Sequence, residues 1–169
     1  MKKRISTEQT DENIRDVLRL LSETPDQLNG LSKGLSDGKL HEPLGKGERS
    51  FIETMAHLLN CESRSSEAIT LALLAREPML ASIHPERDLG KLLHYEQFSF
   101  SELLEYFIFR RGVLLNVLST LKDNQWSRVI RQEGKQRKES VYWQARGLAL
   151  HELEHLQDLE QKLEKQEWK

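Results

Sequence analysis

The sequence has little cysteine, no long apolar run and almost no net charge. Cys61 is the single cysteine among 169 residues, so no internal disulfide can form. This, together with an N-terminus that runs into polar residues without an apolar core, predicts a protein of the reducing cytoplasm. No apolar stretch approaches the roughly 20 residues that cross a bilayer, so we expect no membrane span. The net charge of -2 gives no reason to expect a nucleic-acid partner.

The length and the spacing of apolar residues predict an all-α protein. A chain of 169 residues can bury a substantial core, and we expect a single domain from residue 1 to 169. Four long segments carry apolar residues at helical spacing, and no segment alternates with the period of a strand. No internal repeat or low-complexity segment stands out. The pattern is typical of a four-helix bundle.

The first two helices have recognisable boundaries. The first contains Ile14 to Leu21 and is expected to stop at Thr24-Pro25-Asp26-Gln27, where Thr24 and Pro25 would begin a separate short helix. A loop rich in glycine and proline follows between residues 34 and 47. The second long helix is expected to begin near Ser50 and to end near Arg76.

Two long connections flank the third helix. This helix carries apolar residues from Leu103 to Leu121, and the fourth is expected to begin with Ser140 as its N-cap. Residues 78–98 form a connection longer than an antiparallel helical hairpin needs, so helices two and three are expected to run parallel. Residues 122–139 read as a second long loop between helices three and four.

The fourth helix carries His-Glu-Leu-Glu-His at residues 151–155. Histidines four residues apart lie on one helical face, so His151 and His155 can reach one metal ion. The same pattern occurs in zinc proteases, in which Glu152 would act as the base. That interpretation is disfavoured, because Asp158 and Gln161 stand where the extended motif needs glycine and histidine.

A third histidine on the second helix could complete a metal site. His57 lies in an apolar helical segment, and if the two helices pack together, three imidazoles would bind a metal with an open position. The alternative is that each histidine is an ordinary core or surface side chain. Cys61 follows His57 by one turn and could share the ion, although a lone buried cysteine is more often a small apolar residue.

Other polar residues could support this site or could simply be solvated. Glu53 and Asp158 are each placed to orient an imidazole from outside the ligand set. The 128–138 loop could attract an anionic ligand to the mouth of the site. Its basic residues are Arg128, Arg131, Lys135, Arg137 and Lys138.

Several segments resemble the DinB-like metalloprotein superfamily. The family's helix-two signature, Glu-Trp-Ser-x-x-Glu-x-x-x-His-Leu, is matched by residues 48–58, with Arg49 in place of tryptophan. Arg110, Gln125-Trp126 and residues 149–155 match the downstream part, and the resemblance spans about residues 10–163. The superfamily includes S-transferases that use bacillithiol or mycothiol.

The resemblance implies a bundle of up-down-down-up order and a divalent metal, zinc, nickel or iron, bound by His57, His151 and His155. It also implies a homodimer formed through a bundle face. Arg49 in place of the family's tryptophan is expected to remove a packing anchor before the second helix. We therefore do not transfer the function of any one relative.

The leading functional hypothesis is a metal-dependent enzyme. It would either transfer a low-molecular-weight thiol to an electrophile or hydrolyse a small-molecule substrate, because a bound metal lowers the pKa of a coordinated thiol or water. The alternative is a non-catalytic dimeric bundle that binds a metal or a small ligand. An enzyme would need an open metal position that faces a cavity of a few hundred Å³, roughly the size of ligand sites in general.

Overall fold

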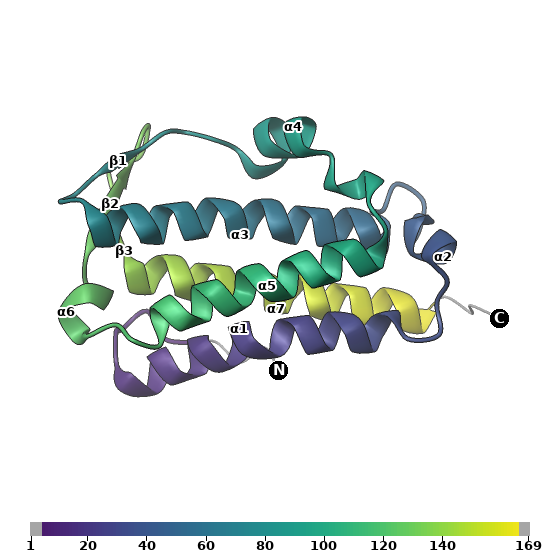
Figure 1. Ribbon diagram of the computed structural model, residues 1–169, viewed down its shortest axis with the longest axis horizontal. Helices are drawn as coiled ribbons and strands as arrows, with labels where there is room; N and C mark the ends of the chain where they lie inside the picture. Colours follow the sequence, from purple (N-terminus) through teal and green to yellow (C-terminus); the bar gives the residue numbers. More distant parts are fainter. Residues whose placement is uncertain (1–4, 166–169) are drawn as a thin grey trace.

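Four long helices lie side by side in the computed structural model, which describes residues 5–165 (Figure 1). They are α1 (Asp11–Ser32), α3 (Phe51–Leu74), α5 (Phe100–Leu118) and α7 (Val141–Lys165). Helices α1 and α7 run in one direction, and α3 and α5 run in the other (Figure 1). The four-helix bundle and its up-down-down-up order are therefore confirmed. Within the described range, no helix is both long and apolar enough to cross a membrane.

The connection between α3 and α5 runs back along the outside of α3 (Figure 1). It contains the short strand β1 (Met79–Leu80), a π-helical turn η1 (Pro85–Gly90), α4 (Lys91–Leu93) and a 3-10 turn η2 (Tyr95–Gln97). This return path is what lets α3 and α5 run parallel. The expectation of parallel helices from the length of this connection is confirmed.

A small sheet closes one end of the bundle and was not expected. It consists of β1, β2 (Val129–Gln132) and β3 (Glu139–Ser140), with β1 parallel to β2 and β2 antiparallel to β3. Met79 pairs with Arg131, and Ile130 pairs with Glu139. The expectation that no strands form was wrong, because strands of two to four residues are too short to show an alternating pattern. The short helices α2 (Asp37–His41) and α6 (Asp123–Trp126) complete the connections.

Serine side chains cap the starts of the three later long helices. Ser50 and Glu53 form a capping box at the start of α3, and Ser99 and Glu102 do the same for α5. The Ser140 hydroxyl accepts a hydrogen bond from the Trp143 amide at 3.1 Å, which caps α7. The starts predicted near Ser50 and Ser140 are therefore confirmed.

Helix α1 does not stop at Thr24, so the predicted break there was wrong. Pro25 lies inside the helix. Proline has no amide N–H, so the Leu21 carbonyl loses its helical partner. That carbonyl instead accepts a hydrogen bond from the Arg111 guanidinium of α5 at 2.5 Å. A donor from another helix thus replaces the missing one, and α1 continues to Ser32.

Arg111 lies at the centre of a buried charge cluster that joins all four helices. Its Nη2 donates to Glu152 of α7 at 2.6 Å and to Glu62 of α3 at 2.8 Å. The Thr24 hydroxyl of α1 lies 3.0 Å from the same Glu152 carboxylate. Burial alone would lower the pKa of Arg111, but the two carboxylates raise it, so the guanidinium stays charged. Apolar clusters lie on both sides, one toward the sheet and one toward α2.

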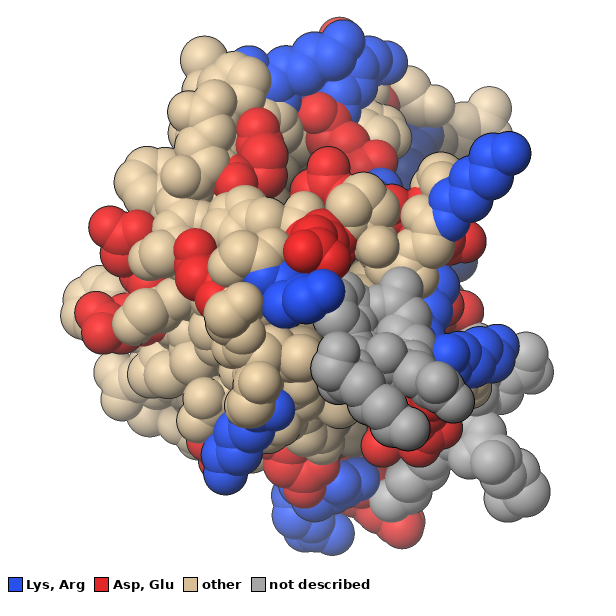
Figure 2. All heavy atoms as spheres, turned by 90° about the vertical axis from the view of Figure 1, so that its right-hand side faces the viewer, with Lys and Arg blue, Asp and Glu red and all other residues tan. Residues whose placement is uncertain are grey.

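Acidic and basic side chains alternate with uncharged ones at the end of the bundle that carries α2 (Figure 2). No single charge sign dominates the part of that face drawn for the described residues.

Replacing Arg111 with methionine is expected to destabilise the fold by about 3 to 5 kcal/mol, because it leaves two buried carboxylates without a cation. The free energy of unfolding by urea measures this. Arg19→Met, which removes an exposed ion pair with Glu23, is the control and should change stability little.

If Arg111→Met does not fold, the triple variant Arg111→Met, Glu62→Leu, Glu152→Leu should restore folding, since apolar side chains can replace a complete buried charge cluster. A loss below about 1 kcal/mol in Arg111→Met would contradict this account of the cluster.

Candidate metal centre

Three imidazoles converge where α3 lies against α7. The Nε2 atom of His151 lies 3.1 Å from Nε2 of His57 and 3.2 Å from Nε2 of His155. A neutral imidazole nitrogen carries either one proton or one lone pair, so His151 Nε2 cannot form a good hydrogen bond with both neighbours. Nitrogens bound to one tetrahedral metal at 2.0–2.1 Å lie about 3.3 Å apart. Both observed spacings are close to this value, but His155 lies outside the group of described residues whose possible ligand atoms are all within 4.8 Å of one another. The pair His57 and His151 therefore fits a shared cation best.

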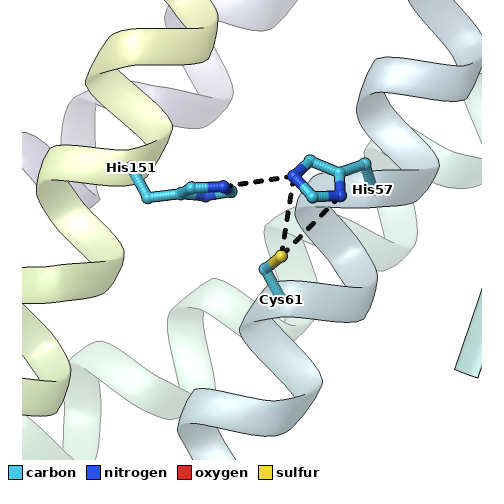
Figure 3. Close-up of side chains that lie close together, drawn as sticks. All are labelled: His57, Cys61 and His151. Carbon is cyan, nitrogen blue, oxygen red and sulfur yellow. Dashed lines mark hydrogen bonds between the residues drawn. The ribbon is translucent and has the colours of Figure 1, made fainter. Parts of the chain in front are cut away.

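Cys61 is a second candidate for the third ligand. Its Sγ lies 3.7 Å from His57 Nε2, one helical turn away on the same face of α3 (Figure 3). The possible ligand atoms of His57, Cys61 and His151 all lie within 4.8 Å of one another. Two ligand sets therefore share His57 and His151 and differ in whether His155 or Cys61 completes them.

The protonation states differ between the two alternatives. Burial lowers the pKa of His57 to about 4, helped by Arg49, and burial also lowers the pKa values of His151 and His155. All three imidazoles are therefore neutral near pH 7, which is the form that binds metals. Burial raises the pKa of the Cys61 thiol to about 12, so a metal would have to displace its proton.

Glu86 orients His57, a role that was not predicted from the sequence. The Glu86 carboxylate lies 2.8 Å from His57 Nδ1 and also pairs with Arg49. A proton on Nδ1 directed at this carboxylate leaves the Nε2 lone pair free to face His151. Arg49, expected only to remove a packing anchor, instead holds the carboxylate that positions His57. Glu86 belongs to η1, and η1 comes close to α3 only in the folded protein. No pattern in the sequence near His57 therefore indicates this contact.

The two acidic residues that could have oriented the histidines, Glu53 and Asp158, contact other groups instead. Glu53 accepts a hydrogen bond from the Ser50 amide at 2.7 Å, and Asp158 pairs with Lys162 at 2.7 Å. Glu152 is fully buried against Arg111, on a different side of α7 from the histidine stripe. It cannot serve as the base of a zinc protease, which agrees with the sequence argument against that function.

His57 also borders a cavity of about 340 Å³ between α3 and the η1–η2 connection. Its wall contains a mixture of charged and polar side chains. They are Arg49, Glu53, His57, Asn60, Glu86, Lys91, His94 and Glu96. His155 borders a different hollow of about 260 Å³ along α7. The nitrogen cluster is therefore adjacent to open space.

The basic 128–138 loop does not reach this cluster. Arg128 donates to the carbonyls of Ala72 and Ala75 at the end of α3, and Arg131 and Lys138 pair with Glu77. Arg137 stacks on Trp143, and Lys135 pairs with Glu139. These contacts belong to the sheet end of the bundle. Of the two alternatives for this loop, the contacts do not support the one in which it lines the mouth of the site, because its charges are engaged at the sheet end.

Comparison with known proteins identifies a family and a similar solved structure. A model described as the DinB superfamily matches residues 20–159. The fold matches YfiT from Bacillus subtilis, described as "a probable metal-dependent hydrolase with an unusual four-helix bundle topology", with a TM-score of 0.86. That match has 17% sequence identity and covers 99% of this chain and 95% of that chain, so it establishes the fold alone. Comparison with curated proteins gave no match.

Proposed function

The chain belongs to the DinB superfamily, and from this premise we propose that it is a metal-dependent enzyme whose divalent ion is bound by His57, His151 and His155. The observation that carries the proposal is the convergence of three neutral imidazole nitrogens, at 3.1 and 3.2 Å, which hydrogen bonding alone cannot satisfy. Imidazole is a common ligand of zinc, nickel and iron, so the ligand type does not identify the ion, and we propose one of these three.

The chain's own residues prepare the site for such an ion. Glu86 fixes the tautomer of His57, and Arg49 holds Glu86 in place. When bound, the ion would supply a nucleophile near neutral pH by lowering the pKa of a coordinated water or thiol. The cavity beside His57 leaves room for a small-molecule substrate.

Hydrolysis of a small substrate is the reaction we favour, and transfer of a low-molecular-weight thiol to an electrophile is the second candidate. The description of YfiT as a probable metal-dependent hydrolase supports the first. The second candidate is based on the S-transferases that the superfamily includes. A non-catalytic metal-binding or ligand-binding bundle is the remaining alternative. The adjacent cavity favours an enzyme over a closed structural metal site, and the activity measurements below separate an enzyme from a ligand-binding bundle. The cytoplasmic location and the single domain from residue 1 to 169 stay predictions.

Purified protein is expected to contain about one divalent ion per chain, since both helices supply ligands in the folded bundle. His151→Ala should abolish metal binding while helix content, followed by circular dichroism, stays largely intact. His41→Ala, at an exposed position of α2, is the control and should retain the ion. Metal retained in a His57→Ala, His151→Ala double variant would refute the proposal.

Metal content per chain also identifies the third ligand. His155→Ala should lose the metal, and Cys61→Ala should keep it. Cobalt-substituted protein adds a direct test, because a thiolate ligand produces a sulfur-to-metal charge-transfer band in the near ultraviolet. If wild-type protein shows this band and Cys61→Ala does not, the third ligand is Cys61 and not His155.

Activity is expected only in the metal-loaded protein. Initial rates should be measured with simple esters and amides, and with bacillithiol, mycothiol, glutathione and coenzyme A against a generic electrophile. Thiol transfer on a metal should persist below the free thiol's pKa of about 8.5. Equal rates with and without metal for every thiol would remove the transferase alternative, and the same result with every ester and amide would remove the hydrolase.

We also propose a homodimer formed through the outer face of α5. An exposed apolar stripe runs along this helix at three- and four-residue spacing, with Tyr106, Phe109, Val113 and Val117 between 36% and 72% exposed. Light scattering should show a dimer that Phe109→Glu converts to a monomer. Leu92→Glu, at an exposed apolar position of α4 and not of α5, is the control and should leave the dimer intact. A monomeric wild-type protein would contradict the proposal.

A further inference from the structure

The turn that carries Glu86 is capped at its start by a histidine. His84 precedes η1 with an extended backbone, at a φ of -91° and a ψ of 125°, and Pro85 takes the first position of the turn. The ring nitrogen Nδ1 of His84 accepts hydrogen bonds from the amides of Glu86, at 3.3 Å, and of Arg87, at 3.2 Å. Amides at the start of a helical turn have no partner within it. His84 therefore acts as the N-cap, a position usually taken by serine, threonine, aspartate or asparagine.

A second side chain closes the same arrangement from within the turn. The Asp88 carboxylate accepts a hydrogen bond from the His84 amide at 2.7 Å. The His84 carbonyl accepts hydrogen bonds from the amides of Asp88, at 3.0 Å, and of Leu89, at 3.4 Å. The cap and the turn thus hold each other, as in the capping box of an α-helix. The His84 ring is therefore placed directly against the backbone of Glu86.

Glu86 transmits this contact to the candidate metal centre. Its carboxylate lies 2.8 Å from His57 Nδ1 and pairs with Arg49, although its side chain is 39% exposed. Water competes for a carboxylate that is exposed to this degree, so its direction depends on how firmly the backbone of η1 is held. His84 is itself exposed, and within residues 5–165 its ring nitrogens form hydrogen bonds with the backbone of η1 alone. Any effect of His84 on His57 therefore passes through Glu86.

We propose that His84 is a positioning residue for His57. By capping η1 it presents the Glu86 carboxylate to His57 Nδ1, which keeps the proton on that nitrogen and directs the Nε2 lone pair at His151. The inference rests on the proposed metal site, because the direction of this lone pair matters for binding an ion. His84 can accept the two amides only through an unprotonated Nδ1, so the proton of the neutral His84 ring lies on Nε2.

Two amide side chains in place of His84 separate capping from any other role of the imidazole. The Oδ1 atom of asparagine lies near the position of histidine Nδ1 and can accept from the same backbone amides, whereas Oε1 of glutamine lies near the position of Nε2. His84→Asn should therefore behave as wild type, and His84→Gln should resemble His84→Ala. His41→Ala is the matched control, because His41 is also exposed and its ring contacts the backbone of its own short helix, α2.

The nitrogen-15 chemical shifts of the His57 ring test the proposal in metal-free protein at pH 7, where this imidazole is neutral. In wild type the proton should lie on Nδ1, which faces Glu86. His84→Ala and His84→Gln should move population to the Nε2–H tautomer, and His84→Asn and His41→Ala should not. A purely structural role would lower the melting temperature without moving this proton. Unchanged His57 shifts in His84→Ala would therefore overturn the proposal.

Zinc affinity, measured by competition with a chelating dye, tests the same path in the loaded protein. Residues that orient a metal-binding histidine typically contribute about 10- to 100-fold to affinity, so Glu86→Ala should weaken zinc binding by about this factor. His84→Ala should weaken it by a smaller factor, and the double variant should bind zinc as Glu86→Ala does, because both changes interrupt one path. Losses that multiply in the double variant would show that His84 acts by another route and would contradict the proposal.

The outcomes for His84 and for the metal centre can be told apart. If wild-type protein binds no zinc but His84→Ala still moves the proton on His57, the positioning role stands and the proposed metal-dependent enzyme fails. If zinc binds, and His84→Ala matches wild type in both its His57 shifts and its zinc affinity, the metal site stands and the role of His84 is wrong.

Discussion

The buried guanidinium of Arg111 constrains the whole bundle. A charge that is almost completely removed from water is tolerated only with close counter-ions, and Arg111 receives them from α3 and α7 and a carbonyl from α1. Four helices must therefore meet at one point with their side chains in a fixed register. The apolar clusters on either side add most of the burial, but apolar packing alone would permit helices to slide or rotate more easily.

This constraint extends to the candidate metal centre through the chain itself. Glu62 directly follows Cys61 on α3, and Glu152 directly follows His151 on α7. Neighbouring residues on a helix point about 100° apart, so anchoring the two glutamates to Arg111 also sets the direction of the adjacent candidate ligands. The buried cluster and the imidazole cluster thus occupy different sides of the same two helices. The geometry of one depends on the geometry of the other.

The features that could be predicted from the sequence are those determined locally. Apolar spacing located the four helices, serine caps located the starts of α3 and α7, and the length of the 78–98 connection indicated parallel helices. The histidine motif on α7 and the family signature around His57 indicated which imidazoles to consider. Pro25 misled the prediction because its missing hydrogen bond is replaced by Arg111, which is distant in sequence. The role of Glu86 was missed for the same reason, since only the folded connection brings it to His57.

The role of Arg49, which stands where the family has tryptophan, can be recognised only in the folded protein. By itself, arginine in place of an aromatic residue predicts lost packing. In the folded protein it places a cation beside Glu86, and Glu86 in turn faces His57. Arg49 and Glu86 also line the cavity that His57 borders. The contact that orients one histidine is therefore at the same time part of the wall of the space beside it, and a change at position 49 would affect the imidazole and the cavity together.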